Sequence, residues 1–203
     1  MRGAVIVLTG EPGAGKSTAA GWFVRQGAAL LDADAIVRQM WNGEELPALA
    51  RERWGSAVFL PDGTIDKRAV SARVFSDDDD YKWLCGVTHP LVYARMEAML
   101  PDSGVTVAEI PMFFENPRPS WADKVLFLYA GSQDRADRNR FRGLDEKELA
   151  RREKFFKSRA ERSALSDWAI CNDGSVEQLF ARLEPVWNCM NELAVRRAGC
   201  WKV

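Results

Sequence analysis

The segment from residue 10 to residue 17, Gly-Glu-Pro-Gly-Ala-Gly-Lys-Ser, restricts the possible folds of this chain more than any other feature. It fits the phosphate-binding pattern G-x-x-x-x-G-K-[S/T], whose glycines let backbone N–H groups turn toward an anion. An unbroken apolar run at residues 4–8 precedes it, as expected for a strand buried on both faces. Apolar residues between 19 and 24 then recur at helical spacing, and Gly27 closes that segment. Strand, loop and helix in this order favour a phosphate site over a chance glycine turn.

The last two residues of the pattern supply the chemistry of the loop. Lys16 places a positive charge at the outer phosphates of a nucleotide, and the Ser17 hydroxyl can ligate Mg²⁺. The loop therefore predicts a nucleoside triphosphate with Mg²⁺ as its ligand.

Composition and charge limit the classes of protein that fit. The 203 residues suit one α/β domain with small insertions, and the net charge of −1 gives no general attraction to nucleic acid or to an anionic membrane. No apolar stretch approaches the roughly 20 residues needed to span a bilayer. The cysteines form no C-x-x-C pair, which predicts reduced thiols in a cytoplasmic protein; they are Cys85, Cys171, Cys189 and Cys200.

Short apolar runs alternate with helical patterns along the rest of the chain. With the first run they predict a five-stranded parallel sheet in a three-layer α/β fold; the further runs are residues 28–31, 105–108, 125–128 and 168–170. Ligands of such sheets bind at the carboxyl ends of the strands. The polar residues Asp34, Glu109 and Asn172, which follow three of these runs, are therefore candidates for one shared site.

Roughly 70 residues separate the second and third predicted strands, too many for a simple crossover. Their pattern is mostly helical. Asp66 is suited to cap one helix, and the acidic run at residues 77–80 suits the start of another. His89-Pro90 predicts the opening of a further helix, with Pro90 at its first position. We expect a small helical subdomain.

The segment from Arg135 to Arg162 carries 11 Lys and Arg against 6 Asp and Glu. We expect a loop at residues 138–143 and then a basic helix, because Asp145 and Glu148 form a capping box. Two interpretations are open: a solvated charged face, or a mobile lid that brings guanidinium groups onto phosphates. The phosphate loop favours the lid.

A phosphate loop alone is compatible with GTPases, motor ATPases and small-molecule kinases. No N/T-K-x-D motif follows the fourth predicted strand, which argues against a GTPase, and the charge and size argue against a nucleic-acid motor. A kinase has to hold a second substrate and exclude water. The helical insert and the basic segment supply the means for both.

Several further motifs, each weak alone, occur in a specific order and spacing. They are Leu8-Thr9-Gly10, Asp32-Ala33-Asp34, Arg73-Val74-Phe75, His89-Pro90-Leu91, Ile110-Pro111, Phe114-Glu115, Arg138, Arg142-Gly143-Leu144, Arg159 with Arg162, and Ile170 with Asn172 and Gly174. On these motifs the chain resembles the dephospho-CoA kinase family over nearly its whole length. The resemblance implies ATP-dependent phosphorylation of the ribose 3′-hydroxyl of dephospho-CoA, the last step of coenzyme A biosynthesis.

The resemblance also implies a division into parts and a set of partners. It implies a P-loop nucleotide-binding core at residues 1–35, 101–134 and 163–203, a helical acceptor-binding subdomain at 36–100, and a basic lid at 135–162. The expected partners are ATP with Mg²⁺ and dephospho-CoA, with no nucleic acid and no membrane. A monomer is expected, and an oligomer stays open.

Carried over residue by residue, the resemblance implies three catalytic residues, Lys16, Asp34 and Arg142. The implied nucleotide-binding residues are Gly10, Gly13, Ala14, Gly15, Lys16, Ser17, Thr18, Arg138, Asn172 and Gly174. The implied acceptor-binding residues are Asp34, Arg73, Phe75, His89 and Glu115. Ser17 would ligate Mg²⁺, and Glu109 would orient the metal through water. Structural alternatives stay open for two of these residues, since Asp34 fits a helix N-cap and His89 a structural helix cap.

Some positions depart from the pattern of the family. Glu11 and Pro12 stand where the loop usually has glycine and a small apolar residue, so that Glu11 brings a carboxylate near the phosphates. Phe156 and Tyr93 also differ from the residues common at their positions. Two other functions therefore stay open: a P-loop kinase of another nucleoside or nucleotide, and a nucleotide-binding regulatory protein with little turnover.

Overall fold

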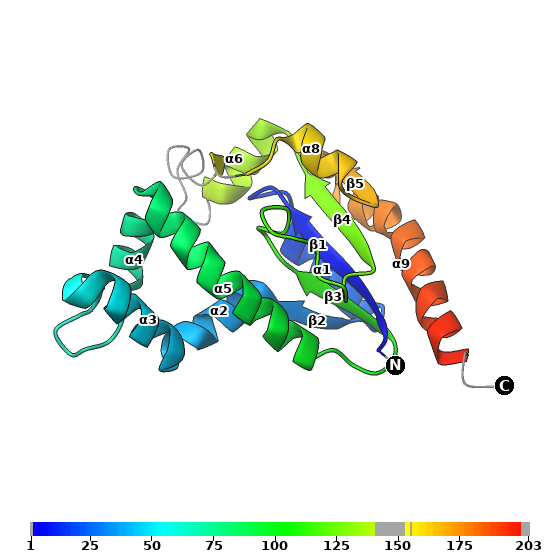
Figure 1. The fold of residues 1–203 in the computed structure, drawn as a ribbon. Helices are drawn as coiled ribbons and strands as arrows, with labels where there is room; N and C mark the ends of the chain where they lie inside the picture. The colour runs from blue at the N-terminus through cyan, green and yellow to red at the C-terminus, as the bar shows by residue number, and fades with distance from the viewer. Residues whose placement is uncertain (1, 141–152, 155, 200–203) are drawn as a thin grey trace. The chain divides into compact units, whose positions relative to one another are not determined.

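The computed structural model describes residues 2–140, 153–154 and 156–199. The chain divides into two compact units, Met1–Asp32 with Met96–Val203 and Ala33–Arg95. A five-stranded sheet forms the centre of the first unit, in the order β2-β3-β1-β4-β5, and every pairing is parallel (Figure 1). Its strands are β1 (Ala4–Gly10), β2 (Ala29–Asp32), β3 (Val105–Glu109), β4 (Lys124–Tyr129) and β5 (Trp168–Cys171). The predicted five-stranded parallel α/β fold is confirmed.

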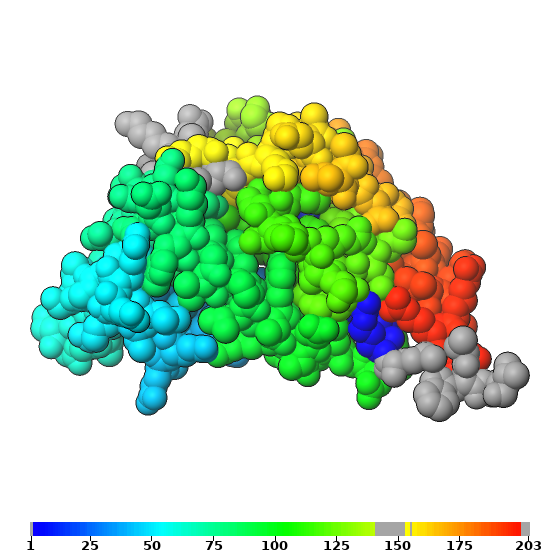
Figure 2. Space-filling model, viewed as in Figure 1, coloured from blue at the N-terminus to red at the C-terminus, as the bar shows by residue number. Residues whose placement is uncertain are grey.

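The central place of β1 follows from its composition. All seven of its residues are buried, and the apolar run Ala4–Leu8 offers side chains to both faces of the sheet. Little of β1 is visible in the space-filling view, because neighbouring atoms cover it (Figure 2). The chain places β2 and β3 on one side of β1, and β4 and β5 on the other. The loop that follows β1 therefore leaves the middle of the carboxyl edge, where open α/β sheets bind their ligands.

Helices α1 (Lys16–Arg25) and α9 (Val176–Gly199) cover one face of this sheet. Their side chains Phe23 and Leu183 are fully buried in one cluster with Ile6 and Leu8 of β1. Neighbouring residues in a strand point to opposite faces, so Val5 and Phe127 belong to the other face. There the ring of Phe114 contacts that of Phe127 edge-on, with centroids 6.0 Å apart. Both faces of the three central strands are thereby closed to water, as a parallel sheet requires.

Two shorter helices lie in the second half of the first unit, α6 (Ser132–Arg140) and α8 (Arg159–Ala164). The predicted loop at residues 138–143 is wrong at its start, because Arg138 lies inside α6. The sequence Ser-Gln-Asp-Arg-Ala-Asp-Arg-Asn-Arg has almost no apolar face, so hydrophobic periodicity could not reveal this helix. Arg142, Gly143, Leu144 and the predicted capping box of Asp145 and Glu148 lie outside the described residues.

The second unit is helical. It contains α2 (Ala33–Asn42), α3 (Glu45–Trp54), a 3₁₀ turn at Gly55–Val58, α4 (Lys67–Val74) and most of α5 (Asp78–Ala98). Asp66 caps α4 as expected, since its side chain accepts from the N–H groups of Arg68 and Ala69. This unit covers residues 33–95, so its bounds differ by only a few residues from those of the predicted insert, residues 36–100. Within the described residues, no helix combines the length and the apolar character needed to cross a bilayer.

The predicted helix start at His89-Pro90 is wrong. Both residues lie inside α5, which runs without a break from Asp78 to Ala98. An internal proline removes one helical hydrogen bond and costs about 3 kcal/mol. The burial of Val92 and Met96, two and six residues after Pro90, offsets that cost. The packing of α5 therefore outweighs the sequence pattern that predicts a helix start at His89-Pro90.

The buried carboxylate of Asp80 joins three helices of the second unit. It accepts hydrogen bonds from Arg53 Nε (3.1 Å), Trp54 Nε1 (2.8 Å) and Arg73 Nε (2.6 Å). Burial raises the pKa of Asp80, but the hydrogen bonds from Trp54, Arg73 and Arg53 outweigh it and hold that pKa below its ordinary value. The ionised form is therefore part of the folded unit.

Replacing Asp80 with alanine is expected to destabilise the protein by about 2–3 kcal/mol, because the Trp54 N–H and two guanidinium groups lose their acceptor. Urea unfolding at pH 7 would measure this, with the exposed Glu52→Ala as the matched control. Because the pKa of Asp80 is lowered, its contribution is complete above about pH 4 and is lost as the pH falls through the folded pKa. The difference between wild type and variant should therefore shrink in acid; a difference constant down to pH 2 contradicts this account.

Candidate active site

The loop between β1 and α1 has the backbone geometry of an anion site. Gly15 precedes α1 with a left-handed φ of 95°, and no side chain caps the helix. Gly13 has φ of 78°, and a Cβ there would lie 2.7 Å from Asn139 Nδ2. Only glycine suits these two positions. The N-terminus of α1, with the positive end of its dipole, thus lies directly after the glycine loop, an arrangement that favours a phosphate group.

Lys16 supplies the charge of this loop. Its ammonium group donates to the carbonyl oxygens of Gly10 (3.1 Å) and Glu11 (3.2 Å), so the side chain folds back over the loop. The next two residues, Ser17 and Thr18, are exposed in the first turn of α1. The loop therefore carries an ammonium group and two hydroxyl groups beside its backbone amides, the donor set that a polyphosphate requires.

Two residues remote in sequence reach the same loop. Arg138 of α6 donates to the carbonyl oxygens of Gly13 (3.2 Å) and Asn172 (3.3 Å). Asn172, which is buried just beyond β5, donates its amide to the Ala14 carbonyl at 2.9 Å. Gly174 follows two residues later and is exposed. The fold thus gathers the predicted nucleotide-binding residues around the phosphate loop, while their part in binding remains a prediction.

Carboxylates end the neighbouring strands. Glu109 closes β3, where it pairs in register with Leu8 on one side and with Asp32 on the other. Asp34 lies two residues beyond β2, exposed in the first turn of α2, so it is a helical residue rather than the N-cap. Asp34 belongs to the second unit and Glu109 to the first.

The predicted acceptor-binding residues are divided between the two units. In the second unit Arg73 pairs with Asp80 at 2.6 Å, and His89 lies within α5. Phe75 is the C-cap residue of α4, and its ring centroid lies 6.2 Å from that of Tyr81. In the first unit, Glu115 accepts the N–H of Lys157 at 3.3 Å. Arg142, the predicted catalytic arginine, lies outside the described residues.

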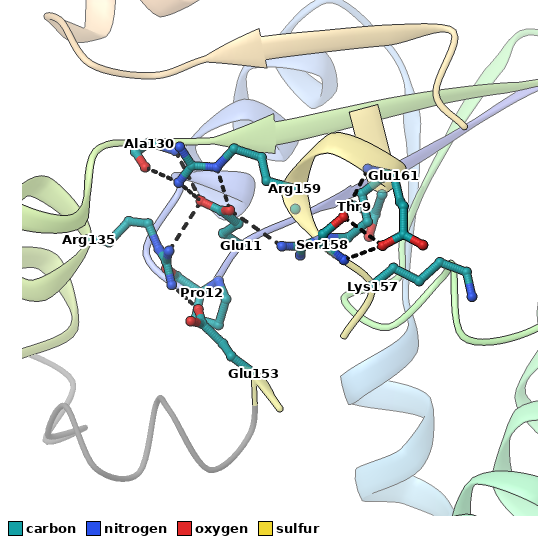
Figure 3. Close-up of polar contacts among 12 residues, drawn as sticks. Thr9, Glu11, Pro12, Ala130, Arg135, Glu153, Lys157, Ser158, Arg159 and Glu161 are labelled. Carbon is teal, nitrogen blue, oxygen red and sulfur yellow. Dashed lines mark hydrogen bonds and ion pairs between the residues drawn. The ribbon is translucent and has the colours of Figure 1, made fainter. Parts of the chain in front are cut away.

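Three arginines surround the carboxylate of Glu11, which sequence reasoning did not foresee. Figure 3 shows Arg159 beside this carboxylate and Arg135 approaching it from another side. Burial lowers the pKa of Arg135 and of Arg162, whereas hydrogen bonding to Glu11 raises the pKa of Arg159. The excess of basic residues in the segment 135–162 was the one signal in the sequence that such a cluster could form.

A parallel sheet whose first strand leads through a glycine-rich phosphate loop into a helix, with strand-end carboxylates beside it, defines the class of P-loop kinases. Comparison with known proteins gives the family. The family profile described as dephospho-CoA kinase matches residues 4–178. This chain belongs to the dephospho-CoA kinase family.

Individual relatives agree with this family. A dephospho-CoA kinase from Mycolicibacterium paratuberculosis is 35% identical over 188 residues, which are 90% of this chain and 46% of the relative, so the chain spans about half of that protein. One from Streptomyces avermitilis is 34% identical over 186 residues, 89% of this chain and 90% of the relative. The crystal structure of TT1252 from Thermus thermophilus is similar with a TM-score of 0.78 at 29% identity, covering 93% of this chain and 98% of that one.

Proposed function

We propose that this chain transfers the γ-phosphoryl group of ATP to the ribose 3′-hydroxyl of dephospho-CoA and so produces coenzyme A. One observation carries the proposal: a chain whose residues 4–178 match the dephospho-CoA kinase family has an uncapped helix and a glycine loop shaped for phosphate. The proposed setting is a cytoplasmic monomer that acts on small molecules, in keeping with its net charge of −1.

The nucleotide would lie along the loop. The loop amides and Lys16 would hold the β- and γ-phosphates, and Thr18 would contact the α-phosphate. Asn172 and Gly174 would line the adenine pocket. Arg138, which donates to the carbonyls of Gly13 and Asn172, would also bind the nucleotide, and it is the alternative to Arg142 as the cation over the transferring phosphoryl group. The hydrogen bonds from Arg138 to Gly13 and from Asn172 to Ala14 connect these residues to the proposed phosphate site.

Mg²⁺ fits the oxygen donors at this edge of the sheet. The ion prefers one or two protein oxygens together with water and phosphate oxygens. Ser17 lies in the first turn of α1, and Glu109 is the last residue of β3, in register with Asp32. Ser17 would therefore ligate the metal through its hydroxyl, and Glu109 would orient it through water. When bound, the metal neutralises charge on the β- and γ-phosphate oxygens.

Asp34 is the proposed partner of the acceptor hydroxyl. A ribose hydroxyl is a very weak acid and an ordinary aspartate has a pKa near 4, so complete deprotonation before attack is ruled out. In a loose phosphoryl-transfer transition state little activation of the nucleophile is needed. Asp34 would orient the hydroxyl and accept its proton late in the reaction, an effect of about 10²–10⁴-fold in rate.

The helical unit is the proposed acceptor-binding part, with Arg73, Phe75 and His89, and Glu115 would contribute from the first unit. The segment 135–162 is the proposed lid. Arg142 would stabilise the charge of the transferring phosphoryl group, a role worth about 10³–10⁵ in rate for an arginine.

The test of the function is ADP release from Mg-ATP in the presence of dephospho-CoA, adenosine, AMP or shikimate. We expect dephospho-CoA alone to stimulate release strongly, with coenzyme A as the product detected by mass spectrometry. Stimulation by another acceptor would favour the related kinase, and no stimulation by any of them the regulatory protein. Either result rejects the proposal.

A further inference from the structure

Glu11 is a buried carboxylate within the phosphate loop. The loop pattern leaves its position open to any residue, yet its side chain is only 3% exposed in the structure. A negative charge in a loop that binds a polyanion repels that ligand, and the repulsion is stronger where water is excluded. The loop can carry this residue only if another group cancels its charge.

Arg159 is the group that matches Glu11 most closely. Its Nε donates to Oε1 and its Nη2 to Oε2, both at 2.8 Å, which makes a two-pronged ion pair (Figure 3). The same Nη2 also donates to the Ala130 carbonyl at 2.9 Å. Two parallel charge-assisted hydrogen bonds are among the strongest pairings available to a carboxylate. Arg159 therefore fixes both the direction and the charge of Glu11.

The other two arginines contribute less to Glu11. Arg135 lies 3.3 Å from it and also donates to the Pro12 carbonyl at 2.9 Å and to Glu153. Arg162 lies 3.4 Å away, buried over the ring of Phe127, and its Nε has no acceptor among the described residues. Neither forms the two short bonds that Arg159 forms.

We propose that Glu11 and Arg159 are a charge-compensating pair that sets how tightly the phosphate loop binds the polyphosphate of its nucleotide. The inference rests on the proposed binding of ATP by this loop, and within it Arg159 acts through Glu11 as a positioning residue. Without Arg159, a buried carboxylate stands beside the phosphates with its closest counter-charge removed. Without both side chains, neither the repulsion nor the compensation remains.

The pair predicts a loss that a second substitution repairs. In Arg159→Gln, the affinity for ATP measured by calorimetry at low salt should fall by about tenfold or more. The loss should be smaller for ADP and within about twofold for AMP, because the repulsion grows with the charge of the ligand. In the double variant Glu11→Gln/Arg159→Gln, ATP affinity should return to within about threefold of wild type.

Three further variants serve as controls for this interpretation. Arg159→Lys keeps the charge but cannot form both parallel bonds, so its ATP affinity should lie between those of wild type and Arg159→Gln. If Arg159→Gln does not fold, Arg159→Met puts an uncharged apolar side chain beside the Tyr129 ring, over which the Arg159 guanidinium lies 5.1 Å from the centroid, and is expected to lose ATP affinity in the same way. Arg196→Gln breaks the exposed pair of Arg196 and Glu192 on α9, 3.5 Å apart, and should change nothing.

Three results would overturn the inference. A double variant as weak as Arg159→Gln would mean that Arg159 binds the nucleotide directly. An equal loss for AMP and ATP would mean that the loop is distorted rather than charged. Unchanged ATP affinity in Arg159→Gln would mean that the other arginines suffice. None of these measurements needs an acceptor, so they stand whether or not dephospho-CoA proves to be the substrate.

Discussion

Replacing Lys16 with methionine is expected to reduce the rate of phosphoryl transfer by about 10²–10³-fold, the usual effect of removing one donor to the charge that develops in a transition state. The ammonium group already lies over the loop, held by the Gly10 and Glu11 carbonyls, and needs little reorganisation to meet a phosphate. Methionine keeps the length of the side chain and removes its charge. The measurement is kcat and kcat/KM for ATP in the coupled ADP assay.

The matched control is Lys82→Met, which removes the same charge from an exposed position on α5. Its rate should equal that of wild type. Thermal unfolding of both variants should change little, because the Lys16 side chain is only partly buried and water can replace its donation to the Gly10 and Glu11 carbonyls. A Lys16→Met protein within threefold of wild-type rate would show that the loop does not hold the transferred phosphate.

The second large effect is expected for Asp34→Asn. This change keeps the size of the side chain and removes its ability to accept a proton, so turnover should fall at least tenfold and by up to about 10⁴-fold. Nucleotide affinity should be unchanged within about twofold, because the loop residues that bind phosphate are intact. The experiment compares kcat with the ATP dissociation constant measured without acceptor.

Asp102→Asn is the control for Asp34, since it makes the same change at an exposed site just before β3. Its kcat should match wild type. An Asp34→Asn enzyme with normal turnover would remove Asp34 from the mechanism, and a parallel loss of nucleotide affinity would mean that the residue supports the loop rather than the acceptor.

The fold was largely predictable because its strands are short apolar runs and a fully buried parallel strand needs such a run. Ala4–Leu8 is the clearest case, and all its residues are buried. The order of the strands was not predictable, since it depends on which edges pair in space. Two predicted helix boundaries were wrong. The sequence pattern was weak around Arg138, which lies inside α6, and packing outweighed the pattern at Pro90, which lies inside α5.

The candidate site was predictable in part for the same reason. Lys16, Ser17 and their glycines are contiguous, so their pattern carries its own geometry. Asn172 could be named as a strand-end residue, but its hydrogen bond to the Ala14 carbonyl joins residues 158 apart in the sequence. A contact between residues so far apart in the sequence produces no periodic pattern from which it could be predicted.

By itself, the sequence determined that a phosphate loop stands between a buried strand and a helix, because glycine conformation and side-chain chemistry are local properties. Only the tertiary structure decided what surrounds Glu11. Its sequence neighbours say nothing of Arg159, which lies 148 positions away and forms two bonds of 2.8 Å with it. The charge of a loop depends on every ionised group within a few ångströms, and the fold alone brings those groups together.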